Sequence, residues 1–392
     1  MVSIFKNRLV RIALLLIAAL FLRFYLPGFL EEGHAVWLRI VDVILIIGIG
    51  TFVLKEIAQV IEETTEVLSD RTKLASGLLQ SLGTAFPDMV LGIVAAIISL
   101  SLVKENYGLA INFAIIAAAT TFGSNIYNIA HAILCVARQN TANKKEGPVP
   151  MVPGIKKTGM VIPMKDHQTK PSLKEIDASI DILNVLTILT TVVVLCMVIF
   201  GQVKSPVPTV SGDLYQLVKP LGLVILVLCI LVMYYFRKTK RSHILVEEVQ
   251  EEETYYQKKP TWFILSYLVV SGVTILFAAE SMVHAVQIFC SITGTPFVVA
   301  GVLAGVIGCI GEMIVVHNFT VNPKGRIGDA LVGVGMDNIV TTMGAAIVAV
   351  MGGIFLGGNS LILIFVLILA LNTVLIWQIS KLKSYFITAK IS

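Results

Sequence analysis

Acidic residues lie inside several long apolar runs of this sequence, among them Glu56, Asp88, Glu280, Glu312 and Asp337. A carboxylate in an apolar environment is costly unless it is paired or binds a cation. Such residues are therefore candidates for ion binding rather than for packing. We favour a functional role for Asp88, Glu312 and Asp337, with Glu56 and Glu280 as further acidic groups at the same depth.

Residues that disturb a helix stand next to two of these carboxylates. Pro87 directly precedes Asp88, and Gly308 and Gly311 precede Glu312. Proline removes a backbone donor and glycine loosens a helix, so carbonyl oxygens such as that of Gly308 become available beside the carboxylate. Carboxylate and carbonyl oxygens together suit a hard cation such as Ca²⁺ or Na⁺, not a soft metal.

A polar motif follows each carboxylate in the next apolar run. Residues 123–128 read Gly-Ser-Asn-Ile-Tyr-Asn, and residues 333–338 read Gly-Val-Gly-Met-Asp-Asn. Four of these side chains can add oxygen ligands: Ser124, Asn128, Asp337 and Asn338. The alternative is packing, because small and amide side chains also join transmembrane helices. For Gly123 and Asn125 both interpretations remain open.

The elements that position these residues are predicted to be membrane helices. Of the 392 residues, 56% are hydrophobic and only 14% are charged, against about 25% charged in a soluble domain. This composition excludes a soluble enzyme and a disordered chain. The five cysteines form no CxxC pair and are expected to be buried apolar side chains rather than a disulfide or zinc framework.

Ten apolar segments have the roughly 20 residues that a membrane span needs. They cover about 9–29, 36–66, 73–101, 107–138, 180–202, 213–236, 262–292, 296–319, 327–355 and 359–381. Lys and Arg concentrate in alternate loops, while the other loops hold little beyond Lys104 and Lys204. The positive-inside rule then places both termini in the cytoplasm. The net charge of +5 fits this asymmetry, so no nucleic-acid partner is expected.

The first segment follows Lys6, Arg8 and Arg11, as the apolar part of a signal peptide would. It continues to Phe29 without an obvious cleavage site, so we interpret it as a retained helix. The sequence therefore predicts an all-α polytopic protein of about ten spans, integral to a plasma or inner membrane.

The chain also repeats itself at an offset of 224 residues. This offset aligns Glu56 with Glu280 and Asp88 with Glu312, so both carboxylate pairs keep a spacing of 32 residues. The two copies start on opposite sides of the membrane, because five spans separate their first helices. Such inverted-topology repeats are typical of secondary transporters, which bind substrate near the midplane at discontinuous helices.

These observations divide the chain into seven regions. They are an extra N-terminal transmembrane helix (1–35), a first α-repeat region (36–138), a cytoplasmic loop (139–179), two further transmembrane helices (180–236), a charged cytoplasmic loop (237–261), a second α-repeat region (262–355), and a last transmembrane helix with a basic tail (356–392). We expect the first loop to be solvated. The second is interpreted as a charge-mixed linker rather than a regulatory cation site.

Residues 83–88 and 123–128 resemble the first α-repeat of the calcium/cation antiporter superfamily, which includes the sodium/calcium exchangers. That repeat carries Gly-Thr-Ser-x-Pro-Glu and then Gly-Ser-Asn-Ile-Phe-Asn, and here Ala85, Asp88 and Tyr127 are the variants. The second repeat departs further, and residues 308–312 look slightly more like the Gly-Asn-Ala-x-Glu motif of the proton/calcium branch.

The resemblance implies a transporter that exchanges Ca²⁺ for Na⁺ or H⁺, and not an enzyme. Asp88 and Glu312 would be the central cation ligands, one from each repeat. Thr84 would supply a hydroxyl and a backbone carbonyl, and Ser124 and Asn128 would complete the first half. The expected partners are Ca²⁺, a monovalent counter-ion and the lipid bilayer, with no resident cofactor.

Three alternatives stay open from the sequence. The same repeat can build a passive cation channel, a transporter of another cation, or a chain that no longer transports. A membrane enzyme lacks support, because no HExxH, GxSxG or P-loop motif occurs. The histidines His131, His284 and His317 are interpreted as packing groups, with proton coupling by His317 as the alternative. The oligomeric state is left open.

Overall fold

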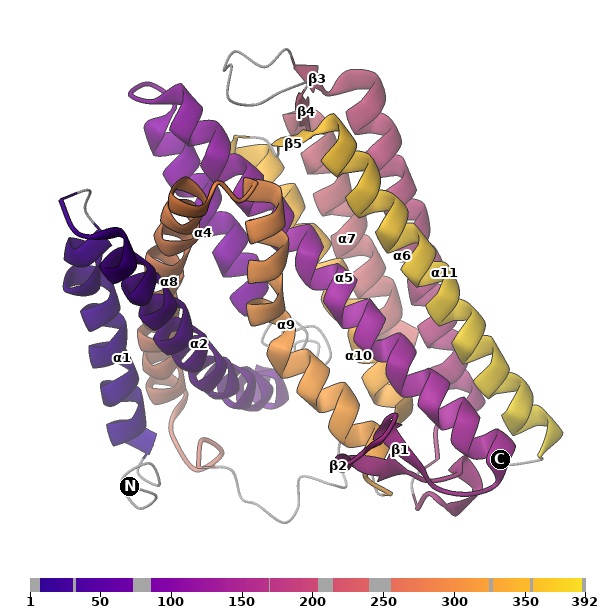
Figure 1. Ribbon diagram of the computed structural model, residues 1–392. Coiled ribbons are helices and arrows are strands. Elements are labelled where there is room, and N and C mark those ends of the chain that lie inside the picture. Colours follow the sequence, from indigo (N-terminus) through magenta and orange to yellow (C-terminus); the bar gives the residue numbers. More distant parts are fainter. Residues whose placement is uncertain are drawn as a thin grey trace.

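Long apolar helices make up most of the structure, a computed structural model that describes residues 8–30, 33–72, 86–168, 170–203, 214–239, 255–323, 327–352 and 355–389. The α-helices of this part are α1 (Arg8–Phe24), α2 (Val36–Thr72), α4 (Phe86–Leu102), α5 (Tyr107–Lys145), α6 (Leu173–Phe200), α7 (Lys219–Thr239), α8 (Thr261–Thr293), α9 (Phe297–Val321), α10 (Ile327–Met351) and α11 (Gly358–Thr388) (Figure 1). Two short 3₁₀ helices are η2 (Leu26–Leu30) and η3 (Met164–Asp166).

Two small antiparallel sheets lie at opposite ends of the helices (Figure 1). The hairpin of β1 (Val149–Val152) and β2 (Ile155–Val161) turns through Gly154, whose φ of +81° suits glycine. At the other end, β4 (Leu214–Gln216) pairs with both β3 (Gln202–Val203) and β5 (Phe355–Gly357). The second sheet ties together the ends of α6, α7 and α11.

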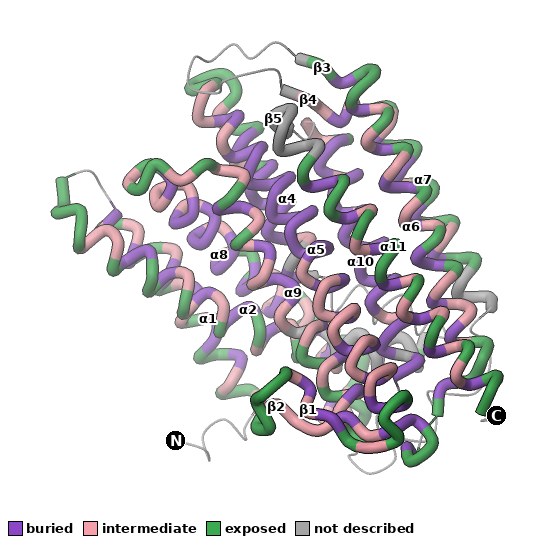
Figure 2. Tube along the Cα trace, turned by 45° about the vertical axis from the view of Figure 1, so that its right-hand side comes forward, coloured by how far each residue is buried: buried purple, intermediate pink, exposed green. Residues whose placement is uncertain are grey.

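The helices form three groups across the molecule (Figure 1). We call α1, α2 and α8 the lateral group, and α4, α5, α9 and α10 the central helices. On the far side of the central helices stand α6, α7 and α11. Figure 2 shows buried residues gathered on α5 and α10 and exposed ones along the outer faces of α7 and α11. Because those exposed residues are largely apolar, such as Val224, Ile230 and Leu363, the outer faces suit lipid contact.

Seven of the described helices are long and apolar enough to cross a bilayer, and the bent α9 would be an eighth. The apolar stretches of α4 and α7, Met89–Leu102 and Lys219–Tyr235, are shorter. An all-α polytopic membrane protein is thereby confirmed. Each of the ten predicted segments overlaps one described α-helix, but a count of ten spans is not confirmed. All five cysteines are free, and all but Cys196 are buried.

The segment 139–179 differs from the solvated loop that the sequence led us to expect. α5 continues to Lys145, and the β1–β2 hairpin buries Val149, Met151 and Val161. The hairpin is held on α5 by the guanidinium of Arg138, whose Nε donates to the Pro150 carbonyl at 2.9 Å. Of the charged segment 237–261, residues 240–254 lie outside the described residues.

Candidate cation site

The helices that carry the two polar motifs of the sequence cross at very short range. α5 packs more extensively on α9 than any other two helices pack on each other in the described chain. A Cβ atom at Gly305 of α9 would lie 2.6 Å from the backbone nitrogen of Ser124, and one at Gly123 of α5 would lie 2.8 Å from Cα of Val302. Only glycine fits this crossing, because the opposing atoms belong to rigid backbone.

This crossing brings together two of the predicted site residues, Asn128 of α5 and Glu312 of α9. The Asn128 Nδ2 donates to Glu312 Oε2 at 2.5 Å, although the residues are 184 positions apart. Their exposed fractions are only 1% and 4%. A buried carboxylate held by an amide donor is typical of a charged ligand that must stay oriented.

α9 is bent next to this carboxylate. The stretches Phe297–Ile310 and Glu312–Val321 meet at an angle of 53°. The bend falls at Gly311, which confirms the break expected from the glycines, since glycine is a common cause of sharp kinks. Gly308 lies buried just before it, so the last carbonyls of the first stretch lie close to Glu312 along the chain.

Further oxygen atoms on α5 are buried without donors. The Oδ1 atoms of Asn125 and Asn128 have no hydrogen-bond partner among the described residues. Ser124 is also buried, and its Oγ donates to the Thr121 carbonyl at 2.9 Å. Its lone pairs remain acceptors. Orphaned buried amide oxygens call for an explanation, and a hard cation is one ligand that satisfies them.

The other predicted residues lie on α4 and α10 or outside the described part. Asp337 is buried on α10, with an exposed fraction of 6%. α10 packs on α4, where a Cβ atom at Gly344 would lie 2.8 Å from Cγ of Met89. Asp88 occupies the first turn of α4, but its side chain, like the whole of Thr84, lies outside the described residues. The expected meeting of Asp88 with Glu312 therefore stays a prediction.

No group of three His, Cys, Asp or Glu side chains that could hold a metal ion occurs within the described ranges. The site that the structure does describe is thus one carboxylate, Glu312, held by the Asn128 amide, with further buried amide and hydroxyl oxygens on the same helix α5.

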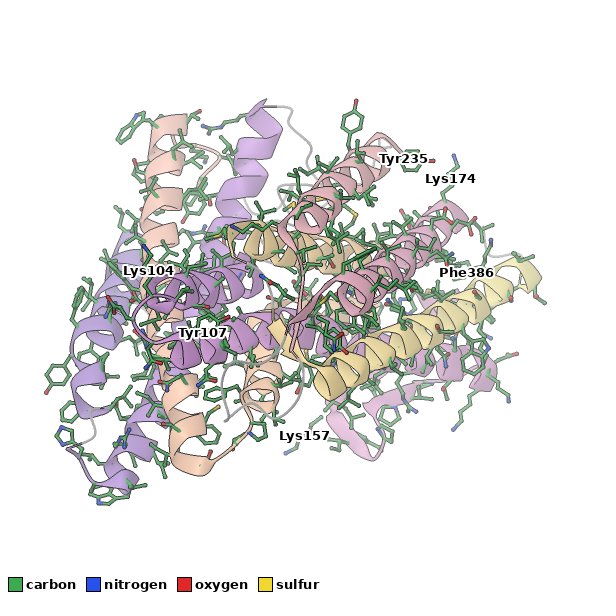
Figure 3. The ribbon with its side chains drawn as sticks, turned by 90° about the horizontal axis from the view of Figure 1, so that it is seen from above. Lys104, Tyr107, Lys157, Lys174, Tyr235 and Phe386 are labelled. Carbon is green, nitrogen blue, oxygen red and sulfur yellow. The ribbon has the colours of Figure 1, made fainter. Side chains whose placement is uncertain are left out.

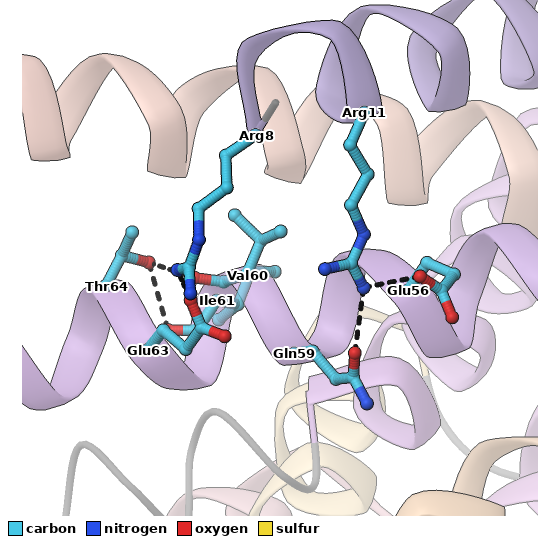
Figure 4. Close-up of polar contacts among 8 residues, drawn as sticks. All are labelled: Arg8, Arg11, Glu56, Gln59, Val60, Ile61, Glu63 and Thr64. Carbon is cyan, nitrogen blue, oxygen red and sulfur yellow. Dashed lines mark hydrogen bonds and ion pairs between the residues drawn. The ribbon is translucent and has the colours of Figure 1, made fainter. Parts of the chain in front are cut away.

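Glu56 and Glu280 stand apart from these residues. Glu56 of α2 contacts Arg11 of α1 (Figure 4), and Glu280 of α8 contacts Arg23 of α1 at 2.7 Å. The sequence indicates only that both are acidic groups at membrane depth, and it does not reveal their arginine partners. The available signal was the presence of arginines at both ends of the first apolar segment.

His317, five residues after Glu312, is held by packing contacts. The ring of His317 stacks on that of His131, with centroids 5.8 Å apart and planes inclined by 19°. Its Nε2 lies 2.8 Å from the Thr158 carbonyl of the hairpin. These contacts agree with the packing role expected for His317, and they join α5, α9 and β2.

Comparison with solved structures identifies proteins of similar fold. The crystal structure of the H⁺/Ca²⁺ exchanger CAX covers 97% of this chain and 89% of its own, with 17% identity and a TM-score of 0.57. A structure of YfkE covers 90% of this chain and 95% of its own, with 12% identity and a TM-score of 0.51. The sodium–calcium exchanger NCX_Mj covers 89% and 99%, with 15% identity and a TM-score of 0.45.

No protein-family model matches the sequence, and no curated protein matches it. At these identities the structural likeness concerns the fold and leaves cargo and counter-ion open. The resemblance of the first repeat to the calcium/cation antiporters is confirmed at the level of the fold, which this chain shares with the H⁺/Ca²⁺ exchanger CAX and with YfkE.

Proposed function

We propose that this protein is a secondary active antiporter that exchanges Ca²⁺ for a monovalent cation, Na⁺ or H⁺, at a site near the midplane. The observation that carries the proposal is the buried Glu312, which Asn128 contacts across the α5–α9 crossing. Carboxylates at membrane depth are typical of ion pathways, and carboxylate and amide oxygens together suit a hard cation.

The ligand set combines both halves of the chain. Glu312 and the Asn128 amide are the described centre, and the Ser124 hydroxyl lies one helical turn before Asn128 on α5. Asp88 and Thr84 complete the first half, and Asp337 and the Gly308 carbonyl the second. All of these ligands are oxygen atoms, which suits Ca²⁺ with its six to eight oxygen ligands.

Exchange follows from charge balance at one site. Carboxylates that share a cavity repel each other unless cations neutralise them. One Ca²⁺ does so, and several monovalent cations also do so, but the two sets cannot occupy the same oxygens together. Mutual exclusion is therefore a physical basis for antiport.

The helix contacts support an inverted repeat of α2–α4–α5 and α8–α9–α10. The second helix of each half packs on the third helix of the other half, α9 on α5 and α4 on α10, while the first helices α2 and α8 pack on each other. Two-fold-related halves produce such reciprocal contacts, and alternating access then arises when one bundle rocks against the other. We take α2 and α8 as the moving pair.

The test is ⁴⁵Ca²⁺ uptake into proteoliposomes, first under an imposed pH gradient and then under a Na⁺ gradient. The pH gradient comes first because the solved structure of similar fold with a TM-score of 0.57 is that of an H⁺/Ca²⁺ exchanger. Gradient-dependent uptake is expected. Equal uptake with neither gradient would show a passive channel instead.

Two variants test the site residues. Glu312→Gln is expected to abolish uptake, because the charge that holds the cation is removed. Asn128→Ala removes a hydrogen bond to a charged group, worth about 1.5–3 kcal/mol. The half-saturating Ca²⁺ concentration should therefore rise by at least about tenfold. Asn140→Ala is the matched control, since Asn140 is also on α5 but donates to the Gln378 carbonyl at 2.9 Å. Uptake by Glu312→Gln at the wild-type rate would refute the site.

A further inference from the structure

The N-terminal helix α1 carries three arginines, and each contacts a glutamate of a neighbouring helix. Arg8 contacts Glu63 of α2, and Arg11 contacts Glu56 of α2, where its Nη2 also donates to Gln59 Oε1 at 2.8 Å (Figure 4). At the other end of α1, Arg23 contacts Glu280 of α8. α1 is thus joined by charge to both helices on which it packs.

The Arg23 contact has the geometry of a strong pair. Nη2 lies 2.7 Å from Oε1, and Nε donates to Oε2 at 2.7 Å. Two parallel bonds of this kind fix direction as well as distance. The side chains of Arg11 and Glu56 are only 18% and 16% exposed. An arginine at such a place is expensive without its partner, so these pairs favour one arrangement of the three helices.

One apolar stripe of α1 lies between the arginines. Its buried residues are Ile12, Leu15, Ala19 and Leu22, and their spacing places them on one helical face. The stripe and the arginines therefore hold the same face of α1 against α2 and α8.

The Arg11–Glu56 and Arg23–Glu280 pairs lie at different levels along α1. Arg11 and Arg23 are 12 residues apart, which is about 18 Å along a helix. Their partners Glu56 and Glu280 are the pair related by the 224-residue offset. An inverted repeat places equivalent residues at mirrored depths, so one helix that crosses the membrane can reach both, one near each end.

Additional contacts stabilise the lateral group at the end where α1 begins. The Arg8 guanidinium lies 5.2 Å from the centroid of the Tyr256 ring, just before α8. The Arg71 Nη2, near the end of α2, donates to the Gln257 carbonyl at 2.8 Å. Ile12, Tyr256 and Ile264 belong to a small apolar cluster of their own, separate from the main core.

The lateral group touches the central helices less than its members touch each other. One of its contacts is the edge-to-face pair of His284 on α8 and Phe113 on α5, with ring centroids 5.3 Å apart. Within the group, Phe24 of α1 meets Phe277 of α8 at 6.0 Å. The first aromatic pair therefore lies between the lateral group and the central helices, and the second lies inside the lateral group.

We propose that α1 is a clasp that makes α2 and α8 one rigid body, which moves as a unit against the central helices during transport. Arg11 and Arg23 are positioning residues, and Glu56 and Glu280 are their counter-charges rather than cation ligands. The transport part of this proposal rests on the proposed exchange function; the mechanical part does not.

A pair of cross-links tests which helices move together. In a background whose five cysteines are replaced by alanine, Phe24→Cys with Phe277→Cys joins α1 to α8, and Phe113→Cys with His284→Cys joins α5 to α8. The first cross-link is expected to leave the exchange rate within about twofold, and the second to lower it by at least about tenfold until a reductant is added. Arrest by the first cross-link, or an unchanged rate with the second, would overturn the clasp.

A charge cycle tests the arginines directly. Arg23→Met and Glu280→Met should each lower the maximal exchange rate by about tenfold and leave the half-saturating Ca²⁺ concentration within about twofold. The exchanged pair Arg23→Glu with Glu280→Arg should restore most of the rate. A large rise in that concentration for Glu280→Met would make Glu280 a ligand and contradict the proposal. The control Arg39→Met removes an arginine whose Nε donates to the Leu30 carbonyl at 3.0 Å, and it should leave the rate unchanged.

Thermal unfolding of the same variants needs no cargo. Each single variant should lower the unfolding temperature, and the exchanged pair should recover it, because the loss comes from an uncompensated charge. An exchanged pair that unfolds at no higher temperature than the single variants would overturn the clasp. If the wild-type protein shows no cation exchange, the proposed function fails while this cycle still decides whether the clasp exists.

Discussion

At the scale of residues, two glycines set how closely the central helices approach. Gly123 and Gly305 place α5 against the backbone of α9, and this distance lets Asn128 reach Glu312. The site therefore depends on the absence of side chains at these two glycines as well as on the side chains of Asn128 and Glu312. Any side chain at these two positions would separate the amide from the carboxylate.

Gly305→Ala tests this dependence. The new Cβ would lie 2.6 Å from the Ser124 nitrogen, so one helix must shift, at a cost of about 1–3 kcal/mol. We expect a lower unfolding temperature, followed by tryptophan fluorescence in detergent, and loss of exchange. Gly272→Ala is the control, because a Cβ there has no atom within 4 Å and alanine favours the helix by about 1 kcal/mol. Equal effects of the two substitutions would contradict the argument.

Residue type selected Glu312 and Asn128 from the sequence together with the repeat and the motif at 123–128, since carboxylates and amides are rare at membrane depth. Their contact could not be predicted, because the two residues are 184 positions apart and the contact depends on where α5 and α9 cross. The partners of Glu56 and Glu280 were missed for a related reason. Arg8 and Arg11 lie where a signal peptide would carry its basic residues. The partner of an arginine cannot be predicted from the segment that contains the arginine.

At the scale of elements, the β1–β2 hairpin is the largest departure from the expected loop. Its signal was present in Pro153-Gly154, a dipeptide that favours a turn. The lysines around it indicated solvent instead. The hairpin docks on the ends of α5 and α9, through the Pro150 carbonyl with Arg138 and the Thr158 carbonyl with His317. It therefore contacts both helices that form the candidate site.

The docking of the hairpin should weaken in acid through His167. This residue follows η3 outside the spans and is 4% exposed, with Nε2 at 3.3 Å from the Ile162 carbonyl. Burial lowers the pKa of His167 below its usual value, so the folded protein binds fewer protons than the unfolded one. Its contribution to stability is complete above about pH 6.5 and is lost as the pH falls from there towards the folded pKa.

Hydrogen exchange of residues 149–168 measures this effect. After correction for intrinsic rates, we expect faster opening at about pH 5.5 than at about pH 7.5. His167→Gln should remove most of that difference. His34→Gln, a change at an exposed histidine, should keep it. A difference that persists in His167→Gln would exclude this histidine as the cause.

At the scale of the whole molecule, hydropathy located every described α-helix but did not establish how many of them span. The apolar stretches of α4 and α7 are shorter than the spans of the other helices. α5, by contrast, is a span that is mostly enclosed by protein and carries Thr, Ser and Asn in its centre. Hydropathy treats lipid-facing and protein-facing residues alike, so it cannot separate a central helix from an outer one.

The two ends of α5 should lie on opposite sides of the membrane. With 39 residues, α5 is about 58 Å long, and the hydrocarbon core is about 30 Å thick. Lys104 lies just before α5, and Lys174 lies in the first turn of α6, beyond the hairpin that follows α5; Figure 3 labels them at opposite ends of the helices. Both side chains are exposed.

The bias of Lys and Arg predicts that Lys174 is cytoplasmic and that Lys104 is on the outside. In intact cells, with the five native cysteines replaced, a membrane-impermeant maleimide should therefore label Lys104→Cys but not Lys174→Cys. Opening the cells should make both reactive, because neither site is buried. The reverse pattern would invert the orientation and place the hairpin outside. Labelling of both positions in intact cells would mean that the helices between them do not separate the two sides, against the span assignment of α5.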